Sequence, residues 1–281
     1  MKILFIAVFN KHSTNWSQSD ALKKNGVNVI EFDYRYIASQ IGNANRDTHL
    51  IEICKTETPD LVLFSKCNEI HPNVIDECNK VSKTAIWYMD PINNQFSESL
   101  IEKIKRSTYT FCGIWDSFEK AKEIGGDKAH FLHEGFDHLS NYPIDCDYKY
   151  DVSFIGVLRE HRNKYHKEVG FTVINNAFSD KHSEAVSASK INLNFTHGGT
   201  SDRTYKVLAS KGFLLTEPWP NMEKDFTINE DLVIFESESE LKDKITFYLE
   251  NQDERLRISN NGYKTVQKFS RLNWAKKIIN M

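Results

Sequence analysis

Short runs of β-branched and aromatic residues, unbroken by polar alternation, are the feature that most constrains how this chain can fold. The first run spans residues 2–9, and others follow at 61–66 and 84–89. Apolar residues at consecutive positions are typical of strands that are covered on both faces, as in parallel sheets. Segments with helical character lie between them, at 16–25 and 45–56. The pattern predicts an α/β fold with a doubly wound, Rossmann-like sheet.

The same pattern starts again in the second half of the chain, with a buried run at 151–158. Residues 138–150 before it contain a proline and several turn formers and show no periodicity, so we expect an interdomain linker there. We therefore predict two Rossmann-like domains, at 1–140 and 150–271. A last helix at 272–281 is expected to pack back on the first domain.

The composition argues against several classes of protein. The formal net charge is −3 and the sequence pI is about 6.4, so the chain lacks the overall basic character of a nucleic-acid binder, although a local patch can still act. The five cysteines form no C-x-x-C pair, which suggests neither a disulfide framework nor a zinc site and fits a reducing cytoplasm. The apolar N-terminus has no cleavage site, and no run is long enough to span a bilayer. The first loop lacks the G-x-G-x-x-G pattern of dinucleotide sites, and no nucleophile elbow of a hydrolase is present.

Residues 197–217 carry the clearest chemical signal. A glycine-bearing loop leads through a Ser-Asp cap into a short helix, which ends at a glycine before an apolar strand. A helix N-terminus offers unpaired N–H groups, and Arg203 in its first turn adds a cation that can bind phosphate bidentately. We interpret Gly199, Thr200, Ser201 and Arg203 as a cradle for a diphosphate. The alternative is an ordinary amphipathic helix and strand, with Arg203 on a solvated face.

A second candidate for phosphate binding directly follows the strand at 151–158. Gly156 lets a ligand approach the backbone, and Arg159 and Arg162 supply positive charge. A solvated, basic helix start is the alternative. The position between a strand and a helix favours the binding role.

The segment around Arg203 resembles the donor-binding signature of GT-B glycosyltransferases of the CgeB-like, spore-maturation group. The family pattern is matched by Arg203, Tyr205, Leu208, Ala209 and Gly212. The resemblance implies the GT-B fold, in which two Rossmann-like domains with parallel sheets face a central cleft. It also implies a nucleotide-diphosphate sugar as donor substrate, with a UDP-sugar as the first candidate, and no permanently bound cofactor.

Asp90 follows the predicted strand at 84–89, and an aspartate at the carboxyl end of a central parallel strand lies in the ligand crevice. It is the best general-base candidate in the chain. Since an Asp-Pro pair often starts a turn, a turn or helix-cap role is the alternative. The CgeB-like group ends its N-terminal domain with a comparable Gly-Phe-Asp, which implies ligand contacts for His133, Glu134 and Asp137. An exposed polar loop would have the same composition.

Three segments, at 84–91, 151–162 and 189–217, are also similar to phage DNA β-glucosyltransferases, in which the aspartate is the base and the reaction inverts. The similarity implies an inverting transfer. The transfer needs no metal, because cationic side chains and helix N-termini can replace a divalent ion. Hydroxymethylated DNA then joins a glycan or small molecule as a candidate acceptor. A DNA-facing cleft would draw on dispersed cations that are otherwise ordinary solvated surface: Lys11, His12, Lys66, Lys103, Lys105 and Arg106.

Lys206 departs from the family pattern. It stands where the wider family has the glutamate that holds the ribose hydroxyls of the donor, and an ammonium group can only donate hydrogen bonds. Either nucleotide recognition differs in detail, or another acceptor such as Glu217 substitutes. The departure favours a second hypothesis, a non-catalytic GT-B-like binding module. Retention of Asp90, Arg159 and Arg203 together favours an enzyme.

Overall fold

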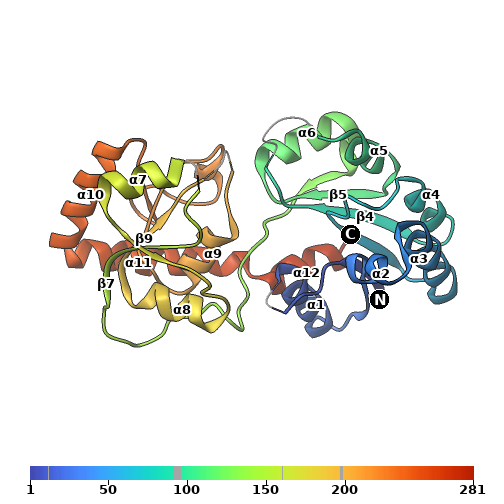
Figure 1. The fold of residues 1–281 in the computed structure, drawn as a ribbon, viewed down its shortest axis with the longest axis horizontal. Coiled ribbons are helices and arrows are strands. Elements are labelled where there is room, and N and C mark those ends of the chain that lie inside the picture. Colours follow the sequence, from blue (N-terminus) through green and yellow to red (C-terminus); the bar gives the residue numbers. More distant parts are fainter. Residues whose placement is uncertain (12, 92–95, 160, 197–198) are drawn as a thin grey trace. The chain divides into compact units, whose positions relative to one another are not determined.

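The computed structural model describes residues 1–11, 13–91, 96–159, 161–196 and 199–281. The chain divides into two compact units (Figure 1). Unit 1 comprises Met1–Glu134 and Arg271–Met281, and unit 2 comprises Gly135–Ser270. The expected α/β class with two parallel sheets is confirmed, because each unit is built on one parallel sheet covered by helices.

The sheet of unit 1 has six parallel strands within the described residues, in the order β2-β1-β3-β4-β5-β6. Strand β1 shows why the sequence lacks alternation. Leu4 and Ile6 enter the core on one face of the sheet, while Ile3 and Phe5 enter the core on the other. The strands are β1 Lys2–Ala7, β2 Asn28–Asp33, β3 Leu61–Ser65, β4 Lys83–Tyr88, β5 Tyr109–Cys112 and β6 Ala129–Phe131.

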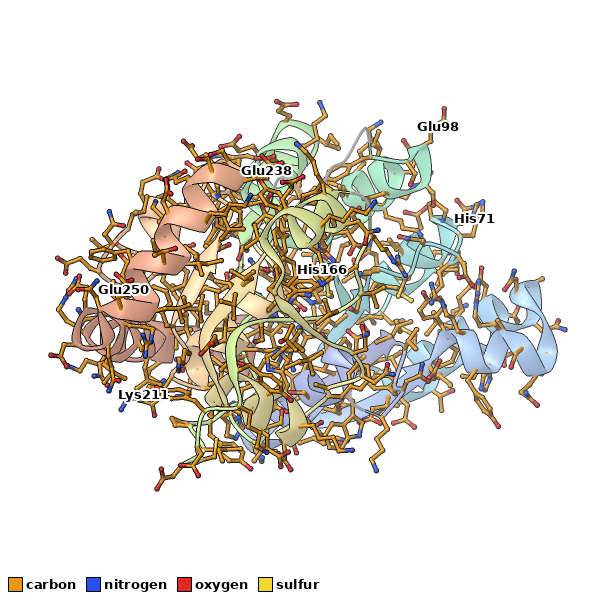
Figure 2. All side chains as sticks on the ribbon, turned by 60° about the vertical axis from the view of Figure 1, so that its left-hand side comes forward. His71, Glu98, His166, Lys211, Glu238 and Glu250 are labelled. Atoms are coloured by element: carbon orange, nitrogen blue, oxygen red, sulfur yellow. The ribbon has the colours of Figure 1, made fainter. Side chains whose placement is uncertain are left out.

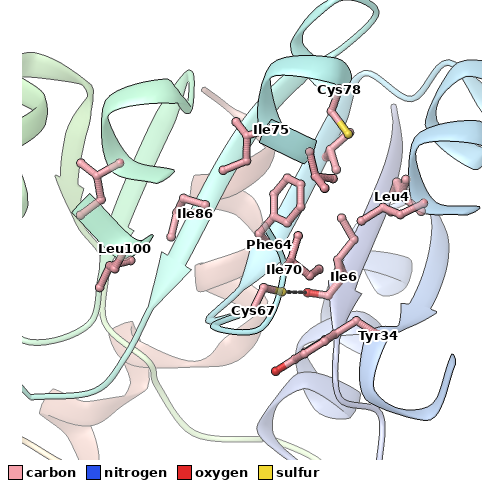
Figure 3. Close-up of a cluster of buried hydrophobic side chains, with 14 of the residues drawn as sticks. Leu4, Ile6, Tyr34, Phe64, Cys67, Ile70, Ile75, Cys78, Ile86 and Leu100 are labelled. Atoms are coloured by element: carbon pink, nitrogen blue, oxygen red, sulfur yellow. Dashed lines mark hydrogen bonds between the residues drawn. The ribbon is translucent and has the colours of Figure 1, made fainter. Parts of the chain in front are cut away.

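Helices cover both faces of this sheet. The C-terminal helix α12 (Arg271–Ile279) packs beside α1 (Thr14–Lys24) in unit 1 (Figure 1). Its fully buried Trp274 contacts the rings of Phe5 and Trp87. The other helices contribute to the core on the opposite face (Figure 3). They are α2 Tyr34–Ile41, α3 Asn43–Glu57, α4 Asn73–Asn79, α5 Glu98–Arg106 and α6 Trp115–Gly125, which is followed by the 3-10 turn η1 Gly126–Lys128.

The sheet of unit 2 has five parallel strands among the residues described, in the order β11-β10-β9-β7-β8. Strands β7 and β9 have six residues each and the other three have two or three, and their apolar side chains again enter two cores. They are β7 Tyr150–Ile155, β8 Thr172–Ile174, β9 Ser189–Asn194, β10 Leu214–Thr216 and β11 Val233–Ile234.

The helices of unit 2 also lie on both faces of its sheet. Helices α8 (Asp180–Ser187) and α9 (Asp202–Ala209) contribute to one core, and α7 (His161–Val169) and α10 (Glu238–Glu250) to the other. Helix α11 (Gln252–Val266) contributes to both. Polar side chains such as Glu250 and Lys211 point outward into solvent (Figure 2). Two 3-10 turns complete the unit, η2 Met222–Lys224 and η3 Gln267–Phe269.

The segment expected as a linker, 138–150, lies on unit 2. The backbone N–H groups of Tyr142 and Ile144 donate to hydroxyls of helix α8, and the N–H of Lys149 donates to the Ala188 carbonyl at 2.8 Å. The boundary between the units instead falls between residues 134 and 135. A segment without periodicity can still be tied down when a neighbouring element satisfies its backbone groups, and the sequence pattern does not show this.

No helix of the residues described is both long and apolar enough to cross a membrane.

Candidate functional site

Both sheets reverse their strand order at one point, and Arg203 lies beside the reversal point of unit 2. In unit 2 the chain runs outward from β7 to β8 and then returns to β9 on the other side of β7. In unit 1 the reversal falls between β1 and β3. The carboxyl ends of strands at such a point form the usual crevice for ligands in open α/β sheets.

Arg203 is fixed at the reversal point of unit 2. Its Nε donates to the carbonyl oxygen of Ile155 at 2.8 Å, and its NH1 donates to Oδ1 of Asn194 at 2.9 Å. Gly156 has φ +147°, and a Cβ at this position would lie 2.9 Å from NH2 of Arg203. The glycine therefore makes room for the guanidinium as well as for its own unusual backbone angle.

The ring of Phe154 supports two arginines. The guanidinium carbon of Arg203 lies 4.8 Å from the ring centroid and that of Arg162 lies 5.3 Å from it. Burial, and to a smaller degree the neighbouring Arg162, lowers the pKa of Arg203 to about 10. Arg203 thus stays charged at neutral pH, and two cations share one side of the crevice, an arrangement that suits an anionic ligand. Arg159 is exposed beside them.

The loop before α9 supplies polar groups to the same place. Gly199 and Thr200 are buried, and within the described residues the hydroxyl of Thr200 has no hydrogen-bond partner. Ser201 precedes the helix, but its hydroxyl donates to Asn194 at 3.3 Å and makes no capping bond to the helix. The first N–H groups of α9 are therefore not capped by that side chain, and a helix N-terminus of this kind attracts anions.

Lys206 and Glu217, the two residues at issue for nucleotide recognition, each have a partner. Lys206 Nζ forms an ion pair with Asp202 one helical turn earlier, at 2.5 Å. The Glu217 carboxylate accepts the backbone N–H of Thr196 at 2.8 Å and lies 3.3 Å from Nε2 of His161. Lys206 is thus ion-paired with Asp202, and Glu217 is held by contacts within unit 2.

Asp90 lies just beyond β4, at the carboxyl edge of the first sheet. Its Oδ1 pairs with Nζ of Lys66 at 2.5 Å, and its backbone carbonyl accepts the Ser117 hydroxyl at 2.8 Å. Both side chains of the ion pair are partly exposed, so a ligand can reach them. The loop after β3 thus brings a cation to the carboxylate that the sequence pattern singled out.

The other candidate residues, His133, Glu134 and Asp137, lie near the boundary between the units and differ in their surroundings. The ring of His133 lies edge-on to Phe131, 4.7 Å away, and Glu134 accepts the hydroxyl of Thr14 at 3.2 Å. Asp137 is buried, and its carboxylate accepts from the Leu139 N–H and the Ser140 hydroxyl, as in a turn. His12 lies outside the described residues.

The proposed row of DNA-facing cations needs a correction. Lys103 is buried, and its ammonium donates to the carbonyl oxygen of Cys67 at 2.7 Å, so it is not available to a phosphate. Lys105 pairs with Glu102, and Arg106 pairs with both Glu102 and Asp76. Lys66 is the cation bound to Asp90. The sequence spacing could not reveal this, because the partners come from other elements.

Several residues at these sites escaped the sequence analysis. Phe154 and Asn194 look like ordinary core positions, yet both hold Arg203. His182 of α8 is buried, with no hydrogen-bond partner at Nδ1 in the described chain, and burial together with Lys206 and Arg203 lowers its pKa to about 3. A lone histidine gives no sequence signal of this kind, since burial and neighbouring cations arise only from the fold.

Comparisons with known proteins fit this arrangement. Residues 142–279 match the family model described as glycosyl transferase-like. No curated protein sequence matches the chain. The similar solved structures have low sequence identity to this chain, so their likeness supports the assignment of the fold alone.

Three of these structures illustrate the TM-scores and sequence identities found. HepE of Anabaena, solved in complex with UDP and glucose, has a TM-score of 0.72 at 12% identity, covering 100% of this chain and 98% of its own. A glycosyltransferase of Rickettsia africae ESF-5 has a TM-score of 0.67 at 12% identity, with coverages of 99% and 97%. The DNA modifying enzyme β-glucosyltransferase has a TM-score of 0.62 at 14% identity, with coverages of 100% and 99%.

The fold is therefore that of the GT-B proteins, with two parallel-sheet α/β units. The glycosyl transferase-like family match covers residues 142–279, which comprise most of unit 2 and helix α12.

Proposed function

We propose that this protein is a glycosyltransferase that moves a sugar from a UDP-sugar to a hydroxyl acceptor. The observation that carries the proposal is the fixed guanidinium of Arg203 at the reversal point of the second sheet, next to Gly156 and the N-terminus of α9. The solved complexes of HepE with UDP and with UDP-glucose support UDP as the nucleotide. The residue pattern around Arg203 supports a place in the CgeB-like group.

The donor side needs positive charge for the departing diphosphate. Arg203, Arg162 and the N-terminus of α9 supply it, with Arg159, Gly199, Thr200 and Ser201 as further binding candidates. These groups can stabilise the developing charge without a divalent ion, so we propose a metal-independent transfer.

The acceptor side needs a base. In the proposed inverting reaction, the acceptor hydroxyl gives its proton to Asp90 while its oxygen forms a bond to the anomeric carbon. The bond from that carbon to the diphosphate breaks, and its electron pair leaves with UDP. His133, Glu134 and Asp137 are proposed as acceptor contacts, and the free cysteines fit a cytoplasmic protein.

A carbohydrate or small neutral hydroxyl compound is the acceptor class that unit 1 favours. Lys66, Lys105 and Arg106 are paired with carboxylates, and Lys103 is buried, so these cations do not form an open basic surface for a phosphate backbone. Hydroxymethylated DNA is kept as the second candidate because a DNA modifying β-glucosyltransferase shares the fold.

A non-catalytic module that binds nucleotide sugars is the competing function. Lys206 favours it, since a lysine paired with Asp202 cannot accept the ribose hydroxyls. The ion-paired, accessible Asp90 favours an enzyme.

A thermal-shift panel of nucleoside diphosphates and their sugars, with and without Mg²⁺, tests the donor proposal. A ligand that binds only the native state raises the melting temperature. We expect UDP and one UDP-sugar to raise it equally with and without metal. No shift with any uridine compound would contradict the donor assignment.

The UDP-sugar that gives the shift is then used in a UDP-release assay with carbohydrate acceptors, hydroxymethylated DNA, or water alone. Asp90→Asn should lower turnover by about 100-fold or more and keep UDP affinity, because only the proton acceptor is lost. Asp127→Asn, at an exposed aspartate of η1, is the control. Donor binding without turnover by the natural protein on any acceptor would favour the non-catalytic module.

A further inference from the structure

The loop after β3 is strained in a way that calls for an explanation. Lys66 and Cys67 have φ angles of +59° and +52°, so two consecutive non-glycine residues adopt the left-handed conformation. This conformation is unfavourable for a residue with a side chain, and strain of this kind persists only where the surrounding structure enforces it. The first of the two is the residue that pairs with Asp90.

Two buried cations hold this loop. Nζ of Lys103, from α5, donates to the carbonyl oxygens of Cys67 at 2.7 Å and Asn68 at 3.3 Å. NH2 of the fully buried Arg46, from α3, donates to the carbonyl oxygen of Glu69 at 2.8 Å. Three successive carbonyls are thus fixed from two different helices. Since a buried cation needs hydrogen-bond partners, these side chains hold the loop in one conformation.

The start of the loop, directly after β3, is also held by hydrogen bonds. The backbone N–H of Lys66 donates to the carbonyl oxygen of Trp87 in β4 at 2.8 Å. The thiol of Cys67 donates to the carbonyl oxygen of Ile6 in β1 at 3.2 Å, and its side chain lies among the apolar residues of the core (Figure 3). With its backbone held on both sides, Lys66 has little freedom except in its own side chain, which ends at the Asp90 carboxylate.

We propose that Lys66 is a positioning residue for Asp90, and that Lys103 acts through the loop to keep Lys66 in place. The inference rests on the proposed transferase function. The ammonium of Lys66 holds Oδ1 of Asp90 at 2.5 Å and leaves Oδ2 for the acceptor hydroxyl. The Ser117 hydroxyl fixes the backbone of Asp90 at the same time, so the carboxylate has one orientation in which it accepts the proton.

Chemical rescue distinguishes positioning from a general structural role. We expect Lys66→Ala to lower kcat at least tenfold in UDP release from the UDP-sugar, with the donor KM and UDP affinity unchanged. Added ethylamine, whose ammonium form can occupy the space of the lost group, should restore several-fold activity to Lys66→Ala and none to Asp90→Asn. Lys66→Arg should retain more activity than Lys66→Ala.

Lys103→Met tests the second half of the proposal, with Lys105→Met as the matched control on the same helix. Lys105 is exposed and pairs with Glu102, so its loss should leave kcat within twofold. Lys103→Met should lower kcat at least threefold without changing UDP affinity. If Lys103→Met does not fold, the rescue of Lys66→Ala still decides the role of Lys66. In that case Lys103→Arg, which keeps a donor at this position, is measured in place of Lys103→Met.

The outcomes separate this inference from the function on which it rests. Full activity of Lys66→Ala, in a protein that Asp90→Asn inactivates, overturns the inference and leaves the transferase proposal standing. Loss of activity in Lys66→Ala without amine rescue and with weakened UDP binding also overturns it. If the natural protein transfers no sugar and hydrolyses no UDP-sugar, both proposals fall together.

Discussion

The guanidinium Nε of Arg203 donates to the carbonyl oxygen of Ile155 at 2.8 Å, which ties the first turn of α9 to the end of β7. The contact joins two segments that lie far apart in the chain. It orients the guanidinium so that NH2 lies next to position 156, where the glycine has no side chain to meet it. The donor-binding geometry proposed for this protein therefore depends on one arginine and the backbone of a distant strand.

Arg203→Lys should weaken UDP binding at least tenfold, about 1.5 to 3 kcal/mol. A lysine keeps the charge but cannot bond Ile155 and Asn194 together and still face a ligand. Isothermal titration with UDP measures the effect. Arg257→Lys is the control, at an exposed position of α11 where Arg257 pairs with Glu254, and should bind UDP like the natural protein. Equal affinities for the two variants would remove Arg203 from the donor site.

Gly156→Ala and Gly170→Ala form a matched pair. Both glycines have positive φ angles, +147° and +74°, so both substitutions should lower the melting temperature through backbone strain, about 1 to 3 kcal/mol. A Cβ at Gly156 also meets Arg203, whereas nothing lies within 4 Å of one at Gly170. We expect only Gly156→Ala to weaken UDP binding, by about tenfold, the 1.4 kcal/mol typical of overpacking. Similar loss of affinity in both variants would point to strain alone.

His182 should make the protein less stable in acid. Burial lowers its pKa to about 3 in the folded protein, against an ordinary value of 6.5. Between these values the unfolded chain binds a proton that the folded protein does not, so this contribution to stability is complete above pH 6.5. It is lost as pH falls, by about 1.4 kcal/mol per unit.

The free energy of unfolding of His182→Gln, measured in urea from pH 7 to pH 4.5, checks this. The variant should show a shallower fall with pH than the natural protein. His71→Gln, at an exposed histidine, should follow the natural curve. Parallel curves for His182→Gln and the natural protein would mean that other groups cause the acid sensitivity.

Trp274→Ala should destabilise unit 1 by about 3 to 5 kcal/mol, the usual cost of a large cavity. Its ring is buried against Phe5 and Trp87, although α12 is the last helix of the chain. Hydrogen exchange followed by peptide should show faster exchange in β1 and β4, with little change in β7 and β9. Trp274→Phe, which refills part of the cavity, should lie between the variant and the natural protein. Faster exchange confined to unit 2 would contradict the place of α12 in the core of unit 1.

Much of the fold could be predicted from the sequence because it depends on local chemistry. The runs at 2–9 and 61–66 contain strands β1 and β3, and the run at 84–89 overlaps all but the first residue of β4, since a strand buried on both faces must be apolar at consecutive positions. Helix α9 and the loop before it followed from a cap, a short helix and a glycine. Helices α2 and α5 and the strands β6 and β8 were missed. The two strands have three residues each, and the two helices have eight and nine, fewer than the window over which helical periodicity is recognised.

The sequence by itself determined which residues bear the candidate chemistry, Asp90 and Arg203 above all, since their types and positions after strands are local properties. The tertiary structure decided what those residues touch. It paired Asp90 with Lys66, placed Arg203 on Phe154 and Ile155, and buried Lys103, which the sequence had offered as a surface cation. The physical reason is that partners, burial and electrostatic surroundings come from segments remote in the chain, which only the packing within each unit brings together.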